Sequence, residues 1–225
     1  MDVTHLRATL QTAFIGCQIE HHTQVASTND IGITRGKTGA AEGTLIIAEH
    51  QTAGRGRYGR KWSAPPRKSL LVSVVLRHRL LRDQVALPNL IGAIAIAQAL
   101  RTTHKLDARI KVPNDVRIKG KKVAGVLTEL AYDDQQHPFF VLGFGVNVNS
   151  TLEDFPPELR ETATSVRIAA ARMGNQDAEI CRTSLLQIIL CQLEKTYQQL
   201  KTGETDLIMR QFEALQERTS HEDDR

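Results

Sequence analysis

The chain has 225 residues, of which 41% are hydrophobic and 24% are charged. These fractions are typical of a globular protein and exclude an intrinsically disordered or low-complexity chain. Cys17, Cys181 and Cys191 are too few and too scattered for a disulfide framework or a CxxC zinc pair, so they predict a reducing, cytoplasmic compartment and roles as small buried residues. The first ten residues lack the apolar core of a signal peptide, and no segment has the ~20 apolar residues of a membrane span.

Positive charge is concentrated in two short segments of a chain whose formal charge is only +4. Residues 51–68 contain six Lys or Arg residues and no acid, and residues 109–122 contain six and one acid, Asp115. Such clusters are typical of a site for a local polyanion, such as a nucleoside triphosphate or a nucleic acid. Two solvated basic surfaces would give the same pattern, so the charge alone leaves both interpretations open.

The first half of the chain predicts two helices and three strands. Apolar residues recur at helical spacing over 4–14, and a short strand is expected over 17–25. Residues 27–30 (STND) then offer N-capping side chains for a second helix. Two β-rich apolar runs, over 43–49 and 69–76, predict buried strands. The stretch that separates these runs is rich in Gly, Arg and Pro and predicts a long loop, a feature that is usually functional or mobile in compact domains.

The second half continues the alternation of helices and strands. After a helix that follows Asp83, strands are expected over 108–112, 116–118, 123–130 and 139–149, the middle two as a hairpin around Lys-Gly-Lys-Lys. An apolar stripe over 185–200 and a segment over 206–215 then predict two helices. The pattern predicts a single mixed α+β domain over 1–218, followed by a charged, disordered tail over 219–225.

The loop sequence Gly-Arg-Gly-Arg-Tyr-Gly-Arg-Lys-Trp, residues 54–62, is the first segment that carries chemistry. Glycine lets backbone N–H groups turn inward as an anion-binding nest, and arginine forks match the oxygens of phosphate or carboxylate. Its spacing fits neither a Walker A loop nor a dinucleotide-binding fingerprint. A loop rich in arginine and glycine could equally bind RNA.

The sequence Lys-Val-Pro-Asn-Asp, residues 111–115, is the second such segment, with Lys-Lys-Val-Ala-Gly-Val-Leu following over 121–127. A lysine at a strand end could lie beside both an attacking carboxylate and an α-phosphate, and Asn114 and Asp115 could orient water or a metal ion at a triphosphate. An ordinary turn and a solvated hairpin tip explain the same residues. The third segment, Gly-Phe-Gly-Val-Asn over 143–147, indicates either close approach of a ligand or backbone, or a bulge in a buried strand.

The order and spacing of these segments resemble those of one known family. The series STN, Q-x-x-GRGRxGRxW, KxPND, KxAGxL-x-E and GxGxNVN resembles the catalytic domain of biotin protein ligases from about Ser27 to Asn149. The resemblance implies a mixed, largely antiparallel β-sheet flanked by helices. It also implies a ligase that forms biotinyl-5'-AMP from biotin and ATP with Mg²⁺, and then transfers biotin to a lysine of a biotin carboxyl carrier protein.

The resemblance implies roles for individual residues. Biotin-binding roles fall on Ser27, Thr28, Asn29, Gln51, Gly54, Arg55, Gly56, Arg57, Lys122 and Gly125. ATP-binding roles fall on Arg55, Arg57, Trp62, Lys111, Asn114, Asp115 and Asn147, and Asp115 is also implied as a magnesium ligand. Lys111 is implied to be the electrostatic catalyst, assisted by Arg57 from a flexible loop that folds over the adenylate. No protein nucleophile is required.

Two departures from the family pattern stand out. Val112 replaces the usual Trp of KWPND, which should loosen packing near the biotin pocket. Helices and a charged tail stand where such ligases continue into a small SH3-like barrel, and no winged-helix segment precedes the domain, so we expect no DNA binding. We expect no membrane partner either, and edge strands in this architecture allow a homodimer.

Three alternative functions remain open. The chain could be a lipoate or octanoate ligase or transferase of the same fold, or a non-catalytic protein that binds biotin or a nucleotide. An RNA-binding module is the third alternative, although aromatic residues make up only 4% of the chain and few are available for base stacking.

Overall fold

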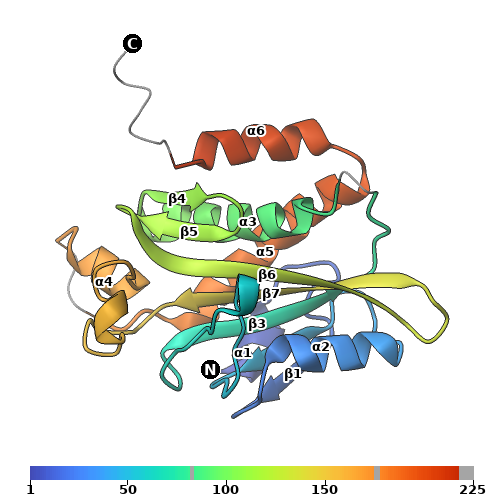
Figure 1. Cartoon of the computed structure of the whole chain (residues 1–225), viewed down its shortest axis with the longest axis horizontal. Helices are drawn as coiled ribbons and strands as arrows, with labels where there is room; N and C mark the ends of the chain where they lie inside the picture. The colour runs from blue at the N-terminus through green and yellow to red at the C-terminus, as the bar shows by residue number, and fades with distance from the viewer. Residues whose placement is uncertain (82–83, 175–177, 218–225) are drawn as a thin grey trace.

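The computed structural model describes residues 1–81, 84–174 and 178–217. Within these ranges seven strands form one sheet in the order β1-β2-β3-β7-β6-β5-β4 (Figure 1). The strands are β1 Ile19–His22, β2 Leu45–Ala48, β3 Ser69–Leu76, β4 Ala108–Lys111, β5 Asp115–Ile118, β6 Lys121–Tyr132 and β7 Pro138–Asn147. β1 and β2 run parallel, and the other neighbouring strands pair antiparallel. The predicted α+β fold with a mixed, largely antiparallel sheet is therefore confirmed.

Helices cover both faces of the sheet (Figure 1). They are α1 Val3–Thr9, α2 Thr28–Lys37, α3 Leu87–His104, α4 Val166–Ala171, α5 Arg182–Lys201 and α6 Thr205–Leu215, with short 3₁₀ turns η1 Arg57–Gly59 and η3 Pro157–Leu159. α3 packs on one face, with α5 and α6 against it. α2 packs on the other face, against β2, β3, β6 and β7. The loop that contains η1 lies on the same side of the sheet as α2 (Figure 1).

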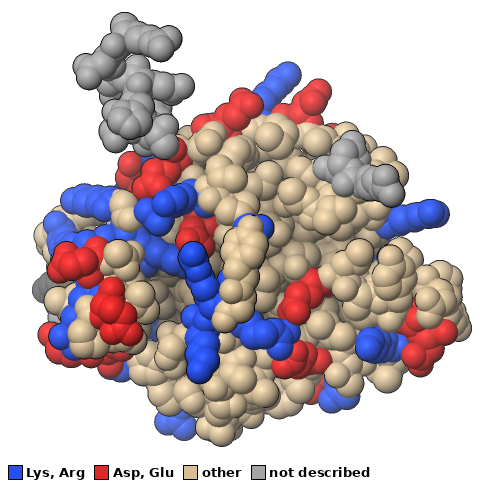
Figure 2. Space-filling model, viewed as in Figure 1, with Lys and Arg blue, Asp and Glu red and all other residues tan. Residues whose placement is uncertain are grey.

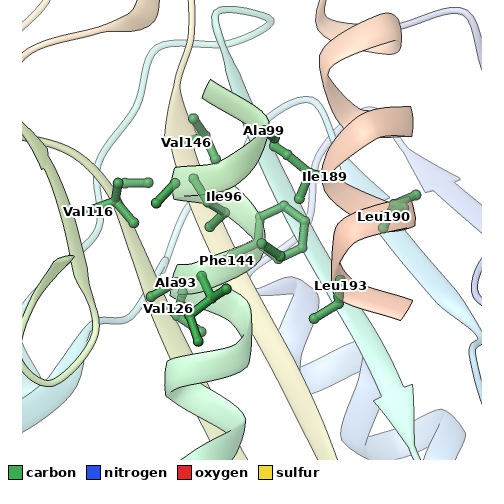
Figure 3. Close-up of a cluster of buried hydrophobic side chains, with 14 of the residues drawn as sticks. Ala93, Ile96, Ala99, Val116, Val126, Phe144, Val146, Ile189, Leu190 and Leu193 are labelled. Carbon is green, nitrogen blue, oxygen red and sulfur yellow. The ribbon is translucent and has the colours of Figure 1, made fainter. Parts of the chain in front are cut away.

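The main hydrophobic core lies between the sheet and α3 and α5 (Figure 3). Side chains of α3 such as Ile96 and of α5 such as Leu193 meet Val126 of β6 and Phe144 of β7. α3 is apolar almost all round because it is enclosed between the sheet and α5. Since strand side chains alternate between faces, the odd-numbered residues of β7 point to the α2 side. There Phe139 joins a second, smaller cluster beneath α2.

Every predicted strand is present, but the first helix is shorter than expected. It ends at Thr9, and the following segment is held by the carboxylate of Glu194 on α5. That carboxylate accepts hydrogen bonds from the backbone N–H groups of Ala13, Phe14 and Ile15 at 2.6, 3.0 and 2.8 Å. These backbone donors are therefore satisfied without a helix, and hydrophobic periodicity alone could not reveal the contact with Glu194.

The cysteines correct one prediction. Cys17 and Cys181 are exposed and Cys191 is half-buried, so they do not serve as small core residues. The predicted domain boundary at 218 and the charged tail over 219–225 lie outside the described residues and stay predictions. Across the part of the chain that the structure describes, no helix combines the length and apolarity needed to cross a bilayer.

Candidate functional site

The first turn of α2 forms one wall of the candidate site. Ser27, Thr28 and Asn29 are buried there against the sheet. Residues 27–30 were expected to offer a capping side chain, but the N-cap residue of α2 is Ser27 and its side chain makes no capping hydrogen bond. Instead Gln51 Oε1 accepts from the backbone N–H of Thr28 at 2.7 Å and from its hydroxyl at 3.1 Å. The start of the 51–68 loop thus satisfies the helix N-terminus, and the two segments are joined at this point.

Asn29 is held from three sides. Its Nδ2 donates to Glu129 Oε2 at 2.6 Å and to the carbonyl of Leu127 at 3.2 Å. Its Oδ1 accepts from the hydroxyl of Ser73 at 2.6 Å, and this hydroxyl also lies 2.7 Å from Thr28 Oγ1. The amide is therefore engaged at both ends by protein groups and forms part of the wall of the site.

Gly143 explains how Asn29 can lie so close to the sheet. A Cβ atom at this position would be only 2.0 Å from Asn29 Oδ1. The β3–β7 and β6–β7 pairings continue without a shift through Gly143 and Gly145. The alternative of a bulge at these glycines is therefore wrong, and the group that approaches them closely is a side chain of the protein itself.

Residues 54–62 form a narrow turn-back loop rather than an open one. The backbone N–H of Trp62 donates to the carbonyl of Gly54 at 2.9 Å, and that of Gly56 donates to the carbonyl of Arg60 at 2.7 Å. Tyr58 at the tip has a φ of 56° and is 86% exposed. In this conformation the N–H of Gly56 is used within the loop, so the loop does not present it to an anion.

The two arginines assigned to this loop behave differently. Arg55 donates from Nη1 to Asp30 on α2 at 2.6 Å and from Nη2 to both carboxylate oxygens of Glu129 on β6 at 3.1 and 3.0 Å. The hydrogen bond to Asp30 raises the pKa of Arg55, with a further contribution from Glu129. Arg57 instead lies over the ring of Tyr58 at 4.9 Å and forms no ion pair with a described acid. Arg57 is therefore free to meet an anion, whereas Arg55 fastens the loop.

Trp62 lies over the middle of the sheet. A Cβ atom at Gly145 would be 2.4 Å from its ring, and one at Gly125 would be 3.4 Å away. The Nζ atom of Lys122 is 5.6 Å from the ring centroid and 2.6 Å from Asp115 Oδ1. The indole N–H is buried and has no hydrogen-bond partner among the described residues, so it remains available as a donor.

A row of paired positions across the sheet brings the sequence segments together. Lys111 of β4 is opposite Asp115 of β5, Asp115 is opposite Gly125 of β6, and Gly125 is opposite Gly145 of β7. Directly opposed residues share a face, so all four lie on the side occupied by Trp62, with Lys111 about 14 Å from Gly145 at ordinary strand spacing. Lys111 is exposed and forms no ion pair with a described residue. The structure thus unites the three segments on one face.

Two asparagines assigned to the nucleotide have partners inside the protein. Asn114 Nδ2 donates to the carbonyl of Val126 at 2.7 Å, and Asn147 Nδ2 donates to the carbonyl of Thr164 at 3.2 Å. Both side chains therefore hold the backbone around the site, and their contact with ATP stays a prediction. Val112, which follows Lys111, is 53% exposed.

The twelve cations of the two basic segments do not all converge. Six of them form ion pairs with acids, namely Arg55, Lys68, Arg109, Arg117, Lys121 and Lys122. Arg57, Arg60, Lys61, Arg67, Lys111 and Lys119 have no such pair within the described residues. Figure 2 shows Lys and Arg gathered around the centre and the β4–β5 side of this face, interspersed with acids. The interpretation as one anion site therefore holds for part of the cluster only.

The residues present do not form a metal site by themselves. No group of three or more His, Cys, Asp or Glu side chains suited to a metal ion occurs among the described residues. Asp115, the predicted magnesium ligand, is instead paired with Lys122 at 2.6 Å. A magnesium ion at this position would depend on oxygens from a nucleotide, as is common for this ion.

Three residues that contribute contacts to the candidate site were not assigned to it from the sequence, although one of them, Glu129, is the final residue of the KxAGxL-x-E motif. Ser73 has a fully buried hydroxyl within the otherwise apolar strand β3. A polar residue in such a strand could have indicated a buried hydrogen-bonding role. Glu129 follows Leu127 by two positions and so shares its face of β6. Asp30 was noted only for capping. Their shared function through Arg55 and Asn29 depends on contacts between distant segments, which no local pattern reveals.

Comparison with known proteins shows the family of this chain. The model of the biotin/lipoate A/B protein ligase family matches residues 18–148, so the chain belongs to this family. It is 33% identical over 199 residues to the bifunctional ligase/repressor BirA of Bacillus subtilis, covering 88% of this chain and 59% of that protein. It is 37% identical over 152 residues to the biotin–[acetyl-CoA-carboxylase] ligase of Mycobacterium tuberculosis, covering 63% of this chain and 53% of that protein. The chain thus spans between half and three fifths of these relatives.

Solved structures show the same fold. The biotin protein ligase from Aquifex aeolicus in complex with biotin and ATP superposes with a TM-score of 0.75 at 26% identity, covering 89% of this chain and 78% of that chain. The biotin protein ligase from Leishmania major in complex with biotinyl-5-AMP superposes with a TM-score of 0.72 at 24% identity, covering 93% and 86%. The likeness to the second structure supports the fold alone.

Proposed function

We propose that this chain is a biotin–protein ligase that activates biotin with ATP and transfers it to a lysine of a carrier protein. One observation carries the proposal: the STN turn, the arginine–glycine loop and the two lysines Lys111 and Lys122 meet on one face of the sheet, over glycines of β6 and β7. The relatives support it by their names: the Mycobacterium tuberculosis protein is named a biotin–[acetyl-CoA-carboxylase] ligase, and the Bacillus subtilis protein is named a bifunctional ligase/repressor.

The first step would join two anions, and the residues suit that task. A biotin carboxylate oxygen attacks the α-phosphorus of ATP, the bond from that phosphorus to the bridging oxygen breaks, and pyrophosphate leaves. Negative charge grows on the phosphoryl oxygens, so fixed cations in a partly closed site lower the barrier. Lys111, at the end of the cross-sheet row, and Arg57, on the loop, are cations that form no ion pair with an acid in the described part of the chain. These two are the proposed catalytic residues.

The second step needs no protein nucleophile. The carrier lysine, in its neutral form, attacks the acyl carbon of biotinyl-5'-AMP; the bond to the phosphate oxygen breaks, AMP leaves, and the amine loses a proton. The mixed anhydride is readily hydrolysed, so a loop that excludes water protects it. We assign this role to the loop over 54–62, and the ion pairs that fasten it through Arg55 to α2 and β6 support the assignment.

The biotin pocket is assigned to the α2 wall and the start of the loop. Ser27 and Thr28 supply buried polar groups, and the half-buried Gln51 lies beside Gly54; such groups are of the kind that recognise a ureido ring. Asn29 is assigned to holding this wall, because both ends of its amide are already engaged by Ser73 and Glu129. Lys122, Gly125, Gly56 and Trp62 are proposed to border the region where the acyl and nucleotide parts meet, and contacts among Lys122, Gly125 and Trp62 support this assignment.

The partners named from the sequence belong to the same proposal. A biotin carboxyl carrier protein is the expected acceptor, since relatives are named for acetyl-CoA-carboxylase. Mg²⁺, the absence of DNA binding, a homodimer and a cytoplasmic location stay predictions. We derive no step through magnesium, because Asp115 is already paired with Lys122.

ATP–pyrophosphate exchange tests the proposal. Purified 225-residue chain is incubated with labelled pyrophosphate, ATP and either biotin, lipoate or octanoate, and exchange is expected with biotin alone. A second assay supplies a carrier domain and detects biotin on its lysine. Exchange with lipoate or octanoate would establish the alternative reaction of the same fold, and binding of biotin without exchange would establish the non-catalytic alternative. RNA binding that depends steeply on salt and does not change when biotin is added would support the RNA-binding alternative.

A further inference from the structure

We propose that Glu129 is a positioning residue that couples the buried polar wall of the site to the docking of the 54–62 loop. The inference deepens the proposed function, on which its enzymatic consequence rests. Its structural part concerns the chain alone and can be tested without any ligand.

Glu129 is the point where two sets of contacts meet. Its Oε2 accepts from Asn29 Nδ2 at 2.6 Å, on the buried side of the site. The same oxygen and Oε1 accept from the guanidinium of Arg55 at 3.0 and 3.1 Å, on the loop. One carboxylate thus fixes the wall and the loop together, and the half-buried position of Glu129 favours its interactions over those of a fully exposed pair.

A second set of contacts also links the buried wall, formed by the first turn of α2, to the loop that begins at Gln51. Ser73 contacts both Asn29 and Thr28, and Thr28 in turn donates to Gln51 at the start of the loop. A chain of polar contacts therefore runs from Gln51, at the start of the 51–68 loop, through Thr28, Ser73, Asn29 and Glu129 to Arg55 in the 54–62 loop. In such a network each group orients the next, so the loss of one side chain inside the network weakens the contacts at both of its ends.

The loop side has a second anchor that does not touch the wall. Asp30 accepts from Arg55 Nη1 at 2.6 Å, and no hydrogen bond joins its carboxylate to Asn29 or Ser73 among the described residues. Asp30 and Glu129 therefore differ in their contacts with the wall. Both hold Arg55, but only Glu129 also holds Asn29.

Consequences for the proposed enzyme follow from this difference. An ordered wall would favour a docked loop, so that biotin bound against the wall would strengthen closure over the adenylate. By thermodynamic linkage, loop docking would in turn favour the ordered wall. Loss of Glu129 would then release biotinyl-5'-AMP prematurely as well as slow its formation.

Trp62 provides a direct readout, because it is the one tryptophan in the sequence and it lies on the docked loop. Acrylamide quenching of its fluorescence measures exposure of the loop. Trypsin cleavage at Arg55, Arg57, Arg60 or Lys61, followed by mass spectrometry, measures the population of the open loop. Both measurements are made on the whole chain without biotin or ATP.

Four variants separate coupling from simple loss of a contact. Glu129→Gln keeps an oxygen acceptor for Asn29 but loses the charge that holds Arg55, and Asp30→Asn weakens the loop anchor alone. Ser73→Ala loosens Asn29 without touching the loop. Glu20→Gln is the matched control, because Glu20 pairs with Arg35 on α2 through a similar bidentate contact away from the site.

We expect Glu129→Gln and Asp30→Asn to raise the rate of loop cleavage about two- to fivefold, the range for partly exposed ion pairs. Ser73→Ala should also raise it, and should raise it less in a Glu129→Gln background than in the wild type. Trp62 quenching should follow the same order, and Glu20→Gln should match the wild type. If Ser73→Ala leaves loop cleavage and Trp62 quenching at wild-type values, the coupling is wrong.

Ser73 is fully buried, so folding of its variant is checked by circular dichroism. If Ser73→Ala does not fold, Asn29→Ala cuts the same link from the helix side, and the same two readouts decide. An enzyme assay then adds the release of free biotinyl-5'-AMP per pyrophosphate formed, which should rise in Glu129→Gln. Failure of the wild type to form adenylate would overturn the proposed function but leave the loop result standing, whereas unchanged loop readouts would overturn only the coupling.

Discussion

Trp62 and Gly145 occupy adjoining space on the α2 face of the sheet, so that a single methyl group on Gly145 would come within 2.4 Å of Trp62 Cε2. The nearest ring atoms also include Cζ2 at 2.6 Å and Nε1 at 2.8 Å. β7 must therefore lack a side chain at this point for the loop to dock. The GxGxN pattern has its physical reason here: the two glycines receive Asn29 and Trp62.

This relationship predicts that Gly145→Ala destabilises the protein because it drives the indole out of its place. Overpacking of this kind costs about 1–3 kcal/mol. The check is thermal unfolding of Gly145→Ala in the wild type and in a Trp62→Phe background, where the smaller ring leaves room for the methyl group. An equal loss of stability in both backgrounds would contradict the steric explanation.

Lys111→Ala should remove activity while the fold survives. Lys111 is exposed and makes no ion pair with a described residue, so its replacement should change the free energy of unfolding by no more than about 0.5 kcal/mol. Loss of a charge that stabilises the transition state typically lowers the rate about 100-fold or more. Exchange of pyrophosphate and thermal unfolding are measured on the same preparation. Exchange close to the wild type would show that Lys111 is not the electrostatic catalyst.

Glu49 predicts an acid-dependent loss of stability. Burial by itself would raise the pKa of this carboxyl, but hydrogen bonds from the Met1 amino group, Arg182 and His21 outweigh it and lower the pKa to about 2. Since the folded pKa lies below the ordinary value of 4.5, the contribution is present above about pH 4.5 and is lost as the pH falls towards 2. From the size of the shift it amounts to about 3 kcal/mol.

Glu49→Gln should abolish this part of the pH dependence and lower Tm by about 6–12 °C at neutral pH, because the largely enclosed Arg182 guanidinium loses its carboxylate partner. Denaturant unfolding between pH 2.5 and 7 measures both effects. Glu20→Gln serves as the comparison, since Glu20 is more exposed and pairs with Arg35 at the surface. Equal pH profiles for the wild type and Glu49→Gln would contradict the assignment.

Tyr197→Phe should destabilise the fold away from the site. Tyr197 is fully buried in the main core, and its hydroxyl donates to Glu42 Oε1 at 2.5 Å. Burial, and next the hydrogen bond to Glu42, raise the pKa of this tyrosine. Loss of a hydrogen bond to a charged acceptor costs about 1.5–3 kcal/mol. Denaturant unfolding measures the loss, and pyrophosphate exchange below the unfolding transition should remain near the wild type.

Local patterns were sufficient for most of the fold. Strand β3 was predicted with its observed bounds, and the hairpin of β5 and β6 and the long helix α5 lie where periodicity placed them. The first helix was predicted too long because Glu194, far along the chain, holds the segment after Thr9. Helix α4, with six residues, is too short to give a clear periodic signal.

The candidate site was predicted as a set of segments but not as a set of contacts. The order of the STN turn, the GRGRYGRKW loop, KVPND and GFGVN indicated which parts of the chain were expected to form the site, and the structure brings these parts to one face of the sheet. The interaction partners of these residues could not be predicted. The sequence does not show that Arg55 binds Asp30 and Glu129. Nor does it show that Lys122 pairs with Asp115 or that Gln51 caps α2. Such choices depend on the distance between atoms that are remote along the chain.

The amino-acid sequence by itself determined the succession of helices and strands, because hydrophobic periodicity and turn residues act over a few neighbouring positions. It also determined the family, because the segments keep their order and spacing. Tertiary structure alone decided which face of the sheet carries the candidate site and which cations form no ion pair within the described residues. That face is set by strand register, where a shift of one residue would turn Gly143 and Gly145 away from Asn29 and Trp62 and expose the core side of β7 instead.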